Sequence, residues 1–369
     1  MSERGLHIEA NMPLSRFTTI KVGGPARYYA HADSLQAIRR GVAWAREHSL
    51  PLLILGGGSN LLIADRGFPG LVLRLNLRGV EYALDGDAVQ LVAAAGENWH
   101  RLVSLTVEHN WAGLECLAGI PGQVGASPIQ NVGAYGQEVQ ETITFVEVFD
   151  IESGEVRVLP NADCGFGYRD SRFKTIDRGR YIVLKVAFRL IQGGAPAVRY
   201  SELNRHFGER RIAYPTLSDV KEAVLTMRRY KSMLLNARDP NSRSVGSFFT
   251  NPIVSEDEFN ALLEIMAPQI RGERVPRFTT PEGRVKVPAA WLIEHAGYLR
   301  GYTQGKVGLS VNHALAVVNR GGATAQEVIA FARQIRNRVR DLFGITLVPE
   351  PTLVGLSLDD DLAEGAHAA

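Results

Sequence analysis

The chain has 369 residues, of which 45% are hydrophobic, enough for two or three domains that each bury a core. Its net charge is only +2 and its Lys and Arg residues form no long run, which argues against nucleic acid or a membrane surface as a partner. No charged-then-apolar leader and no membrane-length apolar run is visible, so we expect a cytoplasmic protein. Cys116 and Cys164 lack metal-ligand spacing and are expected to be buried free thiols, and we expect no metal site.

The first predicted elements are a helix and a strand. Ser34 can cap a helix whose apolar face is formed by Leu35, Ile38, Val42 and Ala45. This helix leads into a short buried strand, Leu52–Leu55. From about Gly70 to Leu190 the alternation of apolar and polar residues predicts mostly strands, at Val146–Asp150, Glu155–Leu159 and Tyr181–Leu190. A loop rich in Gly, Ala and Pro follows at residues 193–196.

The second half of the chain is predicted to contain three helices. The first runs through Val220, Val224 and Met227 and ends in the basic cluster Arg228, Arg229 and Lys231. A polar turn at residues 239–244 then leads into a second domain, with helices at Asp257–Met266 and Glu327–Phe343.

The last helix has the clearest pattern. Thr324 and Glu327 form a capping box, Gly344 follows the end, and one stripe is predicted to be core rather than cofactor contact, at Val328, Phe331, Ile335, Val339 and Leu342. An apolar strand is expected at Ile345–Val348, and the acidic, alanine-rich residues 359–369 are expected to be a frayed tail.

The segment from Gly113 to Gly136, GLECLAGIPGQVGASPIQNVGAYG, combines five glycines after its first residue with two stiffening prolines. Such glycines let backbone N–H groups approach a ligand closely, so we expect a bulky residue at Gly125 to expel it. A turn-rich linker is the alternative, but a linker would carry Ser and charge rather than Leu, Ile, Val and Tyr.

A second glycine cluster, GGGSN at residues 56–60, follows the strand Leu52–Leu55 directly. Successive N–H groups that leave a strand form a concave nest suited to a pyrophosphate. The pattern is neither GxGxxG nor GxxxxGK[ST], so it supports neither a Rossmann site nor a P-loop. Alone it is a weak signal, because a tight turn has the same composition.

With both loops considered, the chain resembles the UDP-N-acetylenolpyruvoylglucosamine reductases, flavoenzymes of peptidoglycan precursor synthesis. The similar motifs follow one order along most of the chain. They are TTIKVGGPARYY (Thr18–Tyr29), LILGGGSNLL, the long glycine segment, GYRDSRFK (Gly167–Lys174), VGSFFTNP (Val245–Pro252) and VPEPTLVG (Val348–Gly355).

This resemblance implies an α+β fold. It implies an FAD-binding domain of the type shared with vanillyl-alcohol-oxidase-like (PCMH-type) flavoenzymes and a smaller C-terminal α+β substrate domain. The expected parts are residues 1–70 and 71–205 for two FAD-binding subdomains, 206–345 for the substrate domain, and 346–369 for a C-terminal segment.

The resemblance also implies the reaction: NADPH-dependent reduction of UDP-N-acetylglucosamine enolpyruvate to UDP-N-acetylmuramate, through non-covalent FAD, by a monomer. Three residues match the family's catalytic positions. Arg169 would bind the substrate carboxylate and stabilise the enolate, Ser247 would donate a proton to the enolate carbon, and Glu350 would donate a hydrogen bond or orient Ser247. From residue type alone, Arg169 paired with Asp170 and Ser247 filling a glycine turn are the preferred interpretations, and an exposed Glu350 after a strand is the alternative for the third residue.

Other residues are expected to bind the cofactor or the substrate. The cofactor contacts are expected at Gly56, Gly57, Gly58, Ser59, Asn60, Gly119, Ile120, Pro121, Gly122, Gly125, Ala126, Asn131, Gly133, Ala134, Tyr135, Gly136 and Tyr168. The substrate contacts are expected at Tyr200, Lys231, Asn251 and His313. For His313, a structural role as a hydrogen-bonded histidine is an equally good interpretation.

Two other classes of protein are compatible with the same FAD-binding fold. An FAD-dependent oxidase or dehydrogenase of small alcohols is the first, but no His or Cys adjoins the GGGSN loop as a covalent flavin anchor. A non-catalytic flavin-binding or UDP-sugar-binding module is the second, and it would have no use for the three catalytic residues together.

Overall fold

The computed structural model describes residues 6–268 and 274–359. By its internal contacts the chain divides into two compact units. Unit 1 comprises residues up to Met12, Ala26–Gly58 and Phe68–Leu234, and unit 2 comprises Pro13–Pro25, Ser59–Gly67 and the residues from Leu235 onward. The four sequence-based parts stay a prediction.

A small sheet begins unit 1. Its order is β1-β2-β5-β3, and both β2 and β3 pair with β5 in parallel. Helix α1 (Leu35–Glu47) connects β2 to β3, and its N-cap is the predicted Ser34, whose Oγ accepts a hydrogen bond from the N–H of Ala37 at 3.2 Å. The buried residues of α1 pack with those of β5 in one apolar cluster, as the predicted apolar stripe requires. The strands are β1 (Ile8–Pro13), β2 (Pro25–Ala32), β3 (Leu52–Leu55) and β5 (Phe68–Leu75).

A larger antiparallel sheet forms the centre of unit 1. Its order is β12-β11-β13-β7-β6, and the short strand β8 (Trp111–Ala112) pairs with the end of β13. The strands are β6 (Val80–Asp85), β7 (Ala88–Ala94), β11 (Ile143–Asp150), β12 (Val156–Pro160) and β13 (Tyr181–Gln192).

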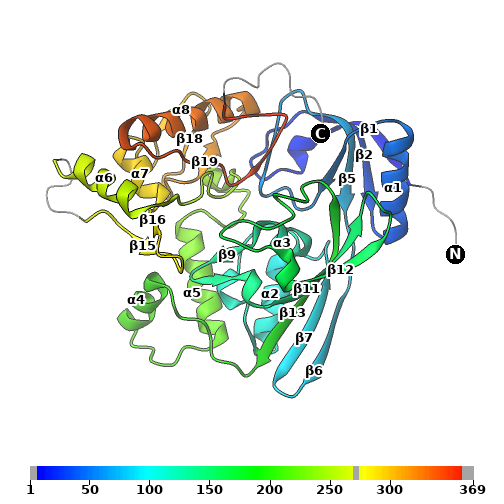
Figure 1. Ribbon diagram of the computed structural model, residues 1–369, viewed down its shortest axis with the longest axis horizontal. Helices are drawn as coiled ribbons and strands as arrows, with labels where there is room; N and C mark the ends of the chain where they lie inside the picture. The colour runs from blue at the N-terminus through cyan, green and yellow to red at the C-terminus, as the bar shows by residue number, and fades with distance from the viewer. Residues whose placement is uncertain (1–5, 269–273, 360–369) are drawn as a thin grey trace. The chain divides into compact units, whose positions relative to one another are not determined.

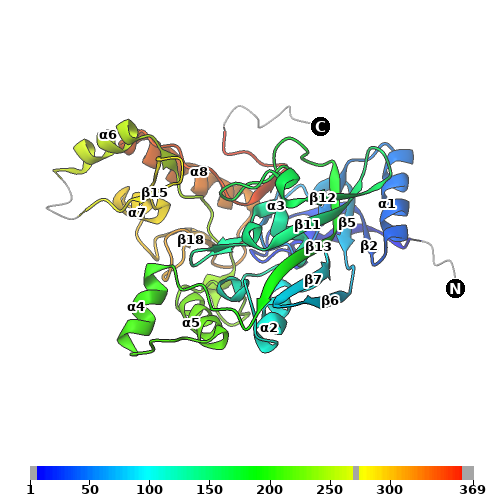
Figure 2. The same cartoon turned by 60° about the horizontal axis from the view of Figure 1, so that its bottom comes forward.

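Three helices pack with this sheet. Helix α5 (Leu217–Tyr230) contacts both α2 (Trp99–Glu108) and α4 (Ser201–Glu209), so the three form a row in both views (Figures 1 and 2). Buried residues of these helices and of β7, β11 and β13 share one apolar cluster, which is the main core of unit 1.

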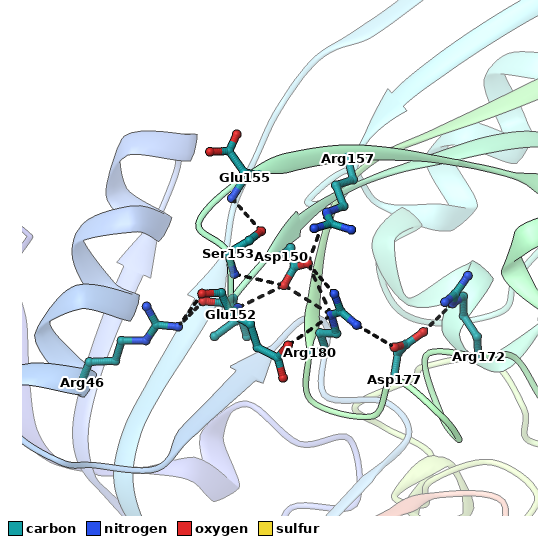
Figure 3. A network of polar contacts seen from close by, with 10 residues as sticks. Arg46, Asp150, Glu152, Ser153, Glu155, Arg157, Arg172, Asp177 and Arg180 are labelled. Atoms are coloured by element: carbon teal, nitrogen blue, oxygen red, sulfur yellow. Dashed lines mark hydrogen bonds and ion pairs between the residues drawn. The ribbon is translucent and has the colours of Figure 1, made fainter.

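A network of charged groups fixes the turn between β11 and β12 (Figure 3). The carboxylate of Asp150 is fully buried and accepts hydrogen bonds from Nη2 of Arg180 at 2.9 Å and from the N–H of Glu152 at 3.0 Å. Arg157 of β12 lies 3.3 Å from the same carboxylate. The hydrogen bond from Arg180 lowers the pKa of Asp150, so this carboxylate stays ionised at neutral pH.

Within its described residues, unit 2 is built from short sheets and three helices around one apolar cluster. Helix α8 (Ala325–Phe343) lies beside β18 and β19 (Figure 1). The other helices are α6 (Glu256–Met266) and α7 (Ala289–His295). The sheets are β14-β16-β15 (Ile253–Val254, Val285–Lys286, Phe278–Thr279), β17-β18-β19 (Thr303–Gln304, Val307–Leu309, Val317–Asn319) and the parallel pair β20-β4 (Thr352–Val354, Leu61–Ile63).

The remaining regular elements are short. Helix α3 (Ser127–Gln130) and the hairpin β9-β10 (Gly133–Ala134, Gln137–Glu138) belong to the long glycine segment. The 3-10 turns are Leu14–Arg16, Glu115–Leu117, Val124–Ala126, Val139–Glu141, Asn161–Cys164 and Pro240–Ser242.

Most predicted elements are confirmed, and the α+β class with them. Helix α8 has the predicted capping box and a left-handed Gly344 at its end, and both cysteines are buried free thiols. The strand expected at Ile345–Val348 is wrong, because this segment packs Ile345 and Leu347 into the core without joining a ladder. The sequence patterns do not predict helices α2, α3, α4 and α7. The tail prediction falls almost wholly outside the described residues.

No helix within residues 6–268 and 274–359 combines the length and the apolar character that crossing a bilayer requires.

Candidate functional site

Two glycine-rich loops of unit 1 lie against each other. Strand β3 ends at Leu55 and enters residues 56–58, where a Cβ added to Gly57 would lie 2.8 Å from Cα of Gly122. Backbones this close require glycine. A Cβ on Gly56 would meet only Oε1 of Gln123, at 3.1 Å. The contact brings the backbones of both loops together, and the N–H groups of such glycine loops can bind a phosphate group.

His100 on α2 anchors the second loop. The N–H of Gly119 donates a hydrogen bond to Nδ1 of His100 at 3.1 Å, so this nitrogen must be unprotonated. Burial, with the charges of Lys221 and Arg228 added to it, lowers the pKa of His100 and favours the neutral ring. Sequence patterns do not reveal this role, since a single histidine on a helix has no diagnostic spacing.

Asn131 ends α3 in the left-handed conformation, with φ of 41°. Its Nδ2 donates to the carbonyl of Gly167 at 2.7 Å and to Oε2 of Glu138 at 3.0 Å. Its Oδ1 accepts from the N–H of Gln140 at 3.2 Å. The side chain therefore organises this part of unit 1, and contact of Asn131 with a cofactor stays a prediction.

Arg169 is held over the same segment. Its Nη2 donates to the carbonyl of Gly133, its Nη1 lies 3.8 Å from Oε1 of Glu138, and its guanidinium lies 5.3 Å from the centre of the Tyr168 ring. The carboxylate of Asp170 instead accepts the N–H of the next residue at 2.8 Å. The φ of Arg169 is +57°, a conformation that a residue with a side chain keeps only where its surroundings impose it.

The hairpin β9-β10 positions an aromatic residue. Tyr135 and Gly136 both have positive φ, as a two-residue hairpin loop of type I′ requires. The Tyr135 ring lies edge-on to Tyr200, with ring centres 5.7 Å apart, and Nζ of Lys231 lies 5.5 Å from the Tyr135 ring centre. Lys231 also pairs with Glu202 at 2.7 Å. Two predicted substrate contacts, Tyr200 and Lys231, therefore meet around Tyr135.

Unit 2 brings Ser247 and Glu350 close along the backbone. The N–H of Phe248 donates to the carbonyl of Leu315 at 2.8 Å, and the N–H of Glu350 donates to the carbonyl of Phe248 at 2.9 Å. Phe248 and Phe249 are fully buried, so they fix the segment in the core. Ser247 precedes these anchors and is half-buried. Its position is therefore set by its neighbours rather than by its own side chain.

The end of the GGGSN loop joins this group. Nδ2 of Asn60 donates to the carbonyl of Glu350 at 3.4 Å. The Thr19 hydroxyl donates to the carbonyl of Ser244 at 2.6 Å and lies 3.4 Å from the carbonyl of Ser59. Thr19 belongs to the TTIKVGG motif, so four separate motifs of the sequence meet in unit 2.

The remaining predicted substrate contacts are Asn251 and His313. Oδ1 of Asn251 accepts the N–H of Ala289, the first residue of α7, at 2.9 Å. Contact of Asn251 with a ligand stays a prediction. His313 lies in the turn before β19, where its carbonyl accepts the N–H of Ala316 at 3.1 Å.

Comparison with known proteins gives two family matches. Residues 26–159 match the model described as "FAD binding domain". Residues 239–354 match the model described as "UDP-N-acetylenolpyruvoylglucosamine reductase, C-terminal domain".

Whole-length relatives agree with these matches. The chain is 44% identical over 354 residues to the UDP-N-acetylenolpyruvoylglucosamine reductase of Thermobifida fusca, which covers 94% of this chain and 98% of the relative. It is 46% identical over 350 residues to that of Streptomyces coelicolor, covering 94% and 90%. Among solved structures, the reductase from Thermus caldophilus is similar with a TM-score of 0.63 and 25% identity, covering 95% of this chain and 98% of that one.

Unit 1 fits the FAD that its domain match predicts. Glycine loops in direct backbone contact offer N–H donors for a diphosphate. Close to them lies a buried cation, Arg228, whose Nε has no hydrogen-bond partner among the residues described. Both features suit an anionic dinucleotide, and the prediction of FAD as cofactor is confirmed by the domain match and the named relatives.

Proposed function

The chain belongs to the UDP-N-acetylenolpyruvoylglucosamine reductase family, and we propose that it reduces UDP-N-acetylglucosamine enolpyruvate to UDP-N-acetylmuramate with NADPH. FAD, when bound, supplies the hydride for the terminal carbon of the enolpyruvyl group. The observation that supports the assignment most directly is the hydrogen-bonded pairing of the Ser247 segment with Glu350.

Arg169 would bind the substrate carboxylate, on which negative charge grows during the reaction. A guanidinium binds a carboxylate through two parallel hydrogen bonds and stays charged at any working pH. In this structure the Arg169 side chain is mostly buried and bonded to the Gly133 carbonyl, so it is already held in place before a ligand binds.

Ser247 would deliver a proton from Oγ to the carbon next to the carboxylate. A hydroxyl is a weak acid, but an enolate carbon is basic enough to take its proton from a positioned donor. Glu350 would hold the Ser247 hydroxyl in orientation or donate a hydrogen bond, since its backbone is bonded to the residue after Ser247. Tyr200 and Lys231 would contact the diphosphate of the substrate.

Separating the two half-reactions tests these roles. Flavin absorbance in stopped flow follows reduction by NADPH and reoxidation by the enolpyruvyl substrate. For Ser247→Ala we expect reduction close to wild type, because that step delivers no proton to a substrate carbon. Reoxidation should slow by about 10²–10⁴-fold, the usual range for loss of a general acid.

Thr250→Val is the matched control. It removes another hydroxyl from the same segment, one that lies 3.4 Å from the carbonyl of Val348, and should slow neither half-reaction. Arg169→Lys should weaken substrate binding as well as slow reoxidation, because an ammonium cannot form the paired hydrogen bonds. Equal slowing of both half-reactions by Ser247→Ala would show that Ser247 shapes the flavin site and is not the proton donor.

A further inference from the structure

Arg228 is an unusual residue of unit 1, because its guanidinium is buried without a negative partner. Only 7% of the residue is exposed, and it forms no ion pair within the described part of the chain. Its Nη2 donates to the carbonyl of Met233 at 3.1 Å, while its Nε is buried with no hydrogen-bond partner among the described residues.

One hydrogen bond to a neutral carbonyl does not compensate for the free-energy cost of burying a guanidinium. Removing such a group from water is costly unless an opposite charge compensates for it. A Met side chain at position 228 would fill similar space without that cost. The loss of the hydrogen bond to Met233 would be small compared with the cost that is avoided. A compensating anion therefore has to come from outside the chain, or the charge is only a burden on the fold.

The neighbours of Arg228 indicate where that anion would bind. A Cβ added to Gly119 would lie 3.4 Å from Cδ of Arg228, so the stem of the side chain runs directly under the glycine loop. The charge of Arg228 also acts on Tyr135, and burial raises the pKa of Tyr135, so the phenol beside Arg228 is neutral. His100 of α2, which accepts the N–H of Gly119, has its pKa lowered by burial and by the charges of Lys221 and Arg228, so the local charge is positive.

Neither family match covers this residue. Arg228 lies between them, since the first match ends at residue 159 and the second begins at residue 239. Gly119 and Tyr135, by contrast, lie inside the FAD-domain match and inside the glycine segment.

We propose that Arg228 is a ligand-binding residue that gives its charge to an anionic oxygen of a bound nucleotide beside Gly119 and Tyr135. The shared chemistry is a phosphate or a comparably charged oxygen, and two nucleotides could supply it: FAD and the uridine diphosphate part of the substrate. The second source rests on the proposed function, whereas the first rests on the FAD domain alone.

Two variants test this inference. Arg228→Met removes the charge and keeps the volume, and Arg229→Met is the matched control, because Arg229 is the next residue of α5 and is exposed. Three quantities are measured for each: the melting temperature of the apoprotein, the Kd of the apoprotein for FAD by fluorescence quenching, and the Kd of the holoprotein for UDP from the flavin spectrum.

For Arg228→Met we expect the apoprotein to melt at or above the wild-type temperature, because an uncompensated buried charge is gone. At the same time one Kd should rise by about 10- to 100-fold, the effect of losing a hydrogen bond to a charged group. A rise in the FAD Kd assigns the anion to FAD, and a rise in the UDP Kd alone assigns it to the substrate. Arg228→Lys keeps the charge but not the planar, two-pronged guanidinium, so its Kd should lie between those of the wild type and Arg228→Met.

The proposal is overturned if Arg228→Met leaves both Kd values unchanged. If Arg228→Met does not fold, unchanged Kd values in Arg228→Lys overturn the proposal instead. Arg228 would then be a structural residue that acts through Met233. Failure of the wild-type protein to bind UDP would count against the proposed function and would leave the FAD measurement valid.

Discussion

The two glycines that follow β3 should respond to the same substitution in opposite ways. In Gly57→Ala the new methyl group would lie 2.8 Å from Cα and 3.3 Å from the carbonyl carbon of Gly122, so two backbones must separate. Overpacking of this kind costs about 1–3 kcal/mol. In Gly56→Ala the methyl group meets only the end of the Gln123 side chain, at 3.1 Å, and the cost should stay below about 1 kcal/mol, offset in part by the stiffer unfolded chain.

For FAD affinity the order of the two substitutions should be reversed, with the larger effect from Gly56→Ala. If the N–H groups of residues 56–58 bind the FAD diphosphate, a methyl group on Gly56 stands where the ligand must approach. Loss of even one hydrogen bond to a charged phosphate should raise the FAD Kd by about tenfold or more. Gly57→Ala should therefore lower the stability of the apoprotein, and Gly56→Ala should mainly lower its FAD affinity.

Urea unfolding of the apoproteins and FAD titration by fluorescence quenching measure the two effects separately. Gly56→Ala with wild-type FAD affinity would place the cofactor away from this loop. Equal stability of the two apoproteins would show that the contact between Gly57 and Gly122 does not hold the loops together.

Three further predictions concern unit 1. Asp150→Asn should lower the free energy of unfolding by about 2 kcal/mol at pH 7, because it removes the acceptor of charge-assisted hydrogen bonds, whereas exposed Glu152→Gln should change little. Since the pKa of Asp150 is lowered, its contribution to the free energy of unfolding is present at neutral pH and is lost as the pH falls through that lowered pKa. Urea unfolding at pH 7 and in acid measures this loss. A difference in unfolding free energy between wild type and Asp150→Asn that is the same at both pH values would contradict the prediction. Burial raises the pKa of Cys164 to about 11 and that of Cys116 further, so neither thiol should react with a disulfide reagent in the native protein at pH 8, while both should react after unfolding. Because the folded state lowers the pKa of His100, stability should fall as the pH drops below about 6.5, and His100→Asn, which keeps an acceptor near the position of Nδ1, should reduce that dependence in thermal melts across pH 5–8.

The sequence predicts those elements whose start, apolar face and end are all marked by residues within the element. Helix α8 was predicted with its cap, its stripe and its terminal glycine, because each of these depends on residues within one or two turns. Helices α2 and α7 are not predicted, although Asn98, the residue before α2, is a good N-cap. The segments on both sides of α2 have strand-like and glycine-rich patterns, and these patterns hide the signal of a single N-cap when the sequence is interpreted segment by segment.

The glycine segment contains one position, Gly125, where the structure gives a different reason for glycine from the one that the sequence suggested. A bulky residue at Gly125 was expected to occupy the space of the ligand. In the structure a Cβ there would lie 2.6 Å from Cβ of Ala95, so the position needs glycine for packing inside unit 1. Substitution of Gly125 would therefore act on the fold first, and it is a poorer test of the cofactor site than Gly56.

Partners of charged residues were beyond the reach of the sequence, because pairs far apart in the chain leave no local pattern. Asp170 was the natural candidate partner of Arg169, but the carboxylate near its guanidinium is Glu138, 31 residues earlier. In the same way, Lys231 pairs with Glu202 on another helix. Such contacts depend on how elements pack, and only the folded chain specifies them.

Arg228 is the exception, since the sequence did contain its signal. Val220, Val224 and Arg228 follow one another at a spacing of four residues, so the periodicity that predicts the buried face of α5 places a guanidinium on that same face. A charge on a buried stripe contradicts the pattern around it, and natural proteins tolerate such contradictions chiefly where function requires them. As a local pattern, the basic cluster at the end of α5 predicts only the end of a helix. Helical periodicity alone separates exposed Arg229 from buried Arg228, and that separation is enough to mark Arg228 as a candidate anion-binding residue.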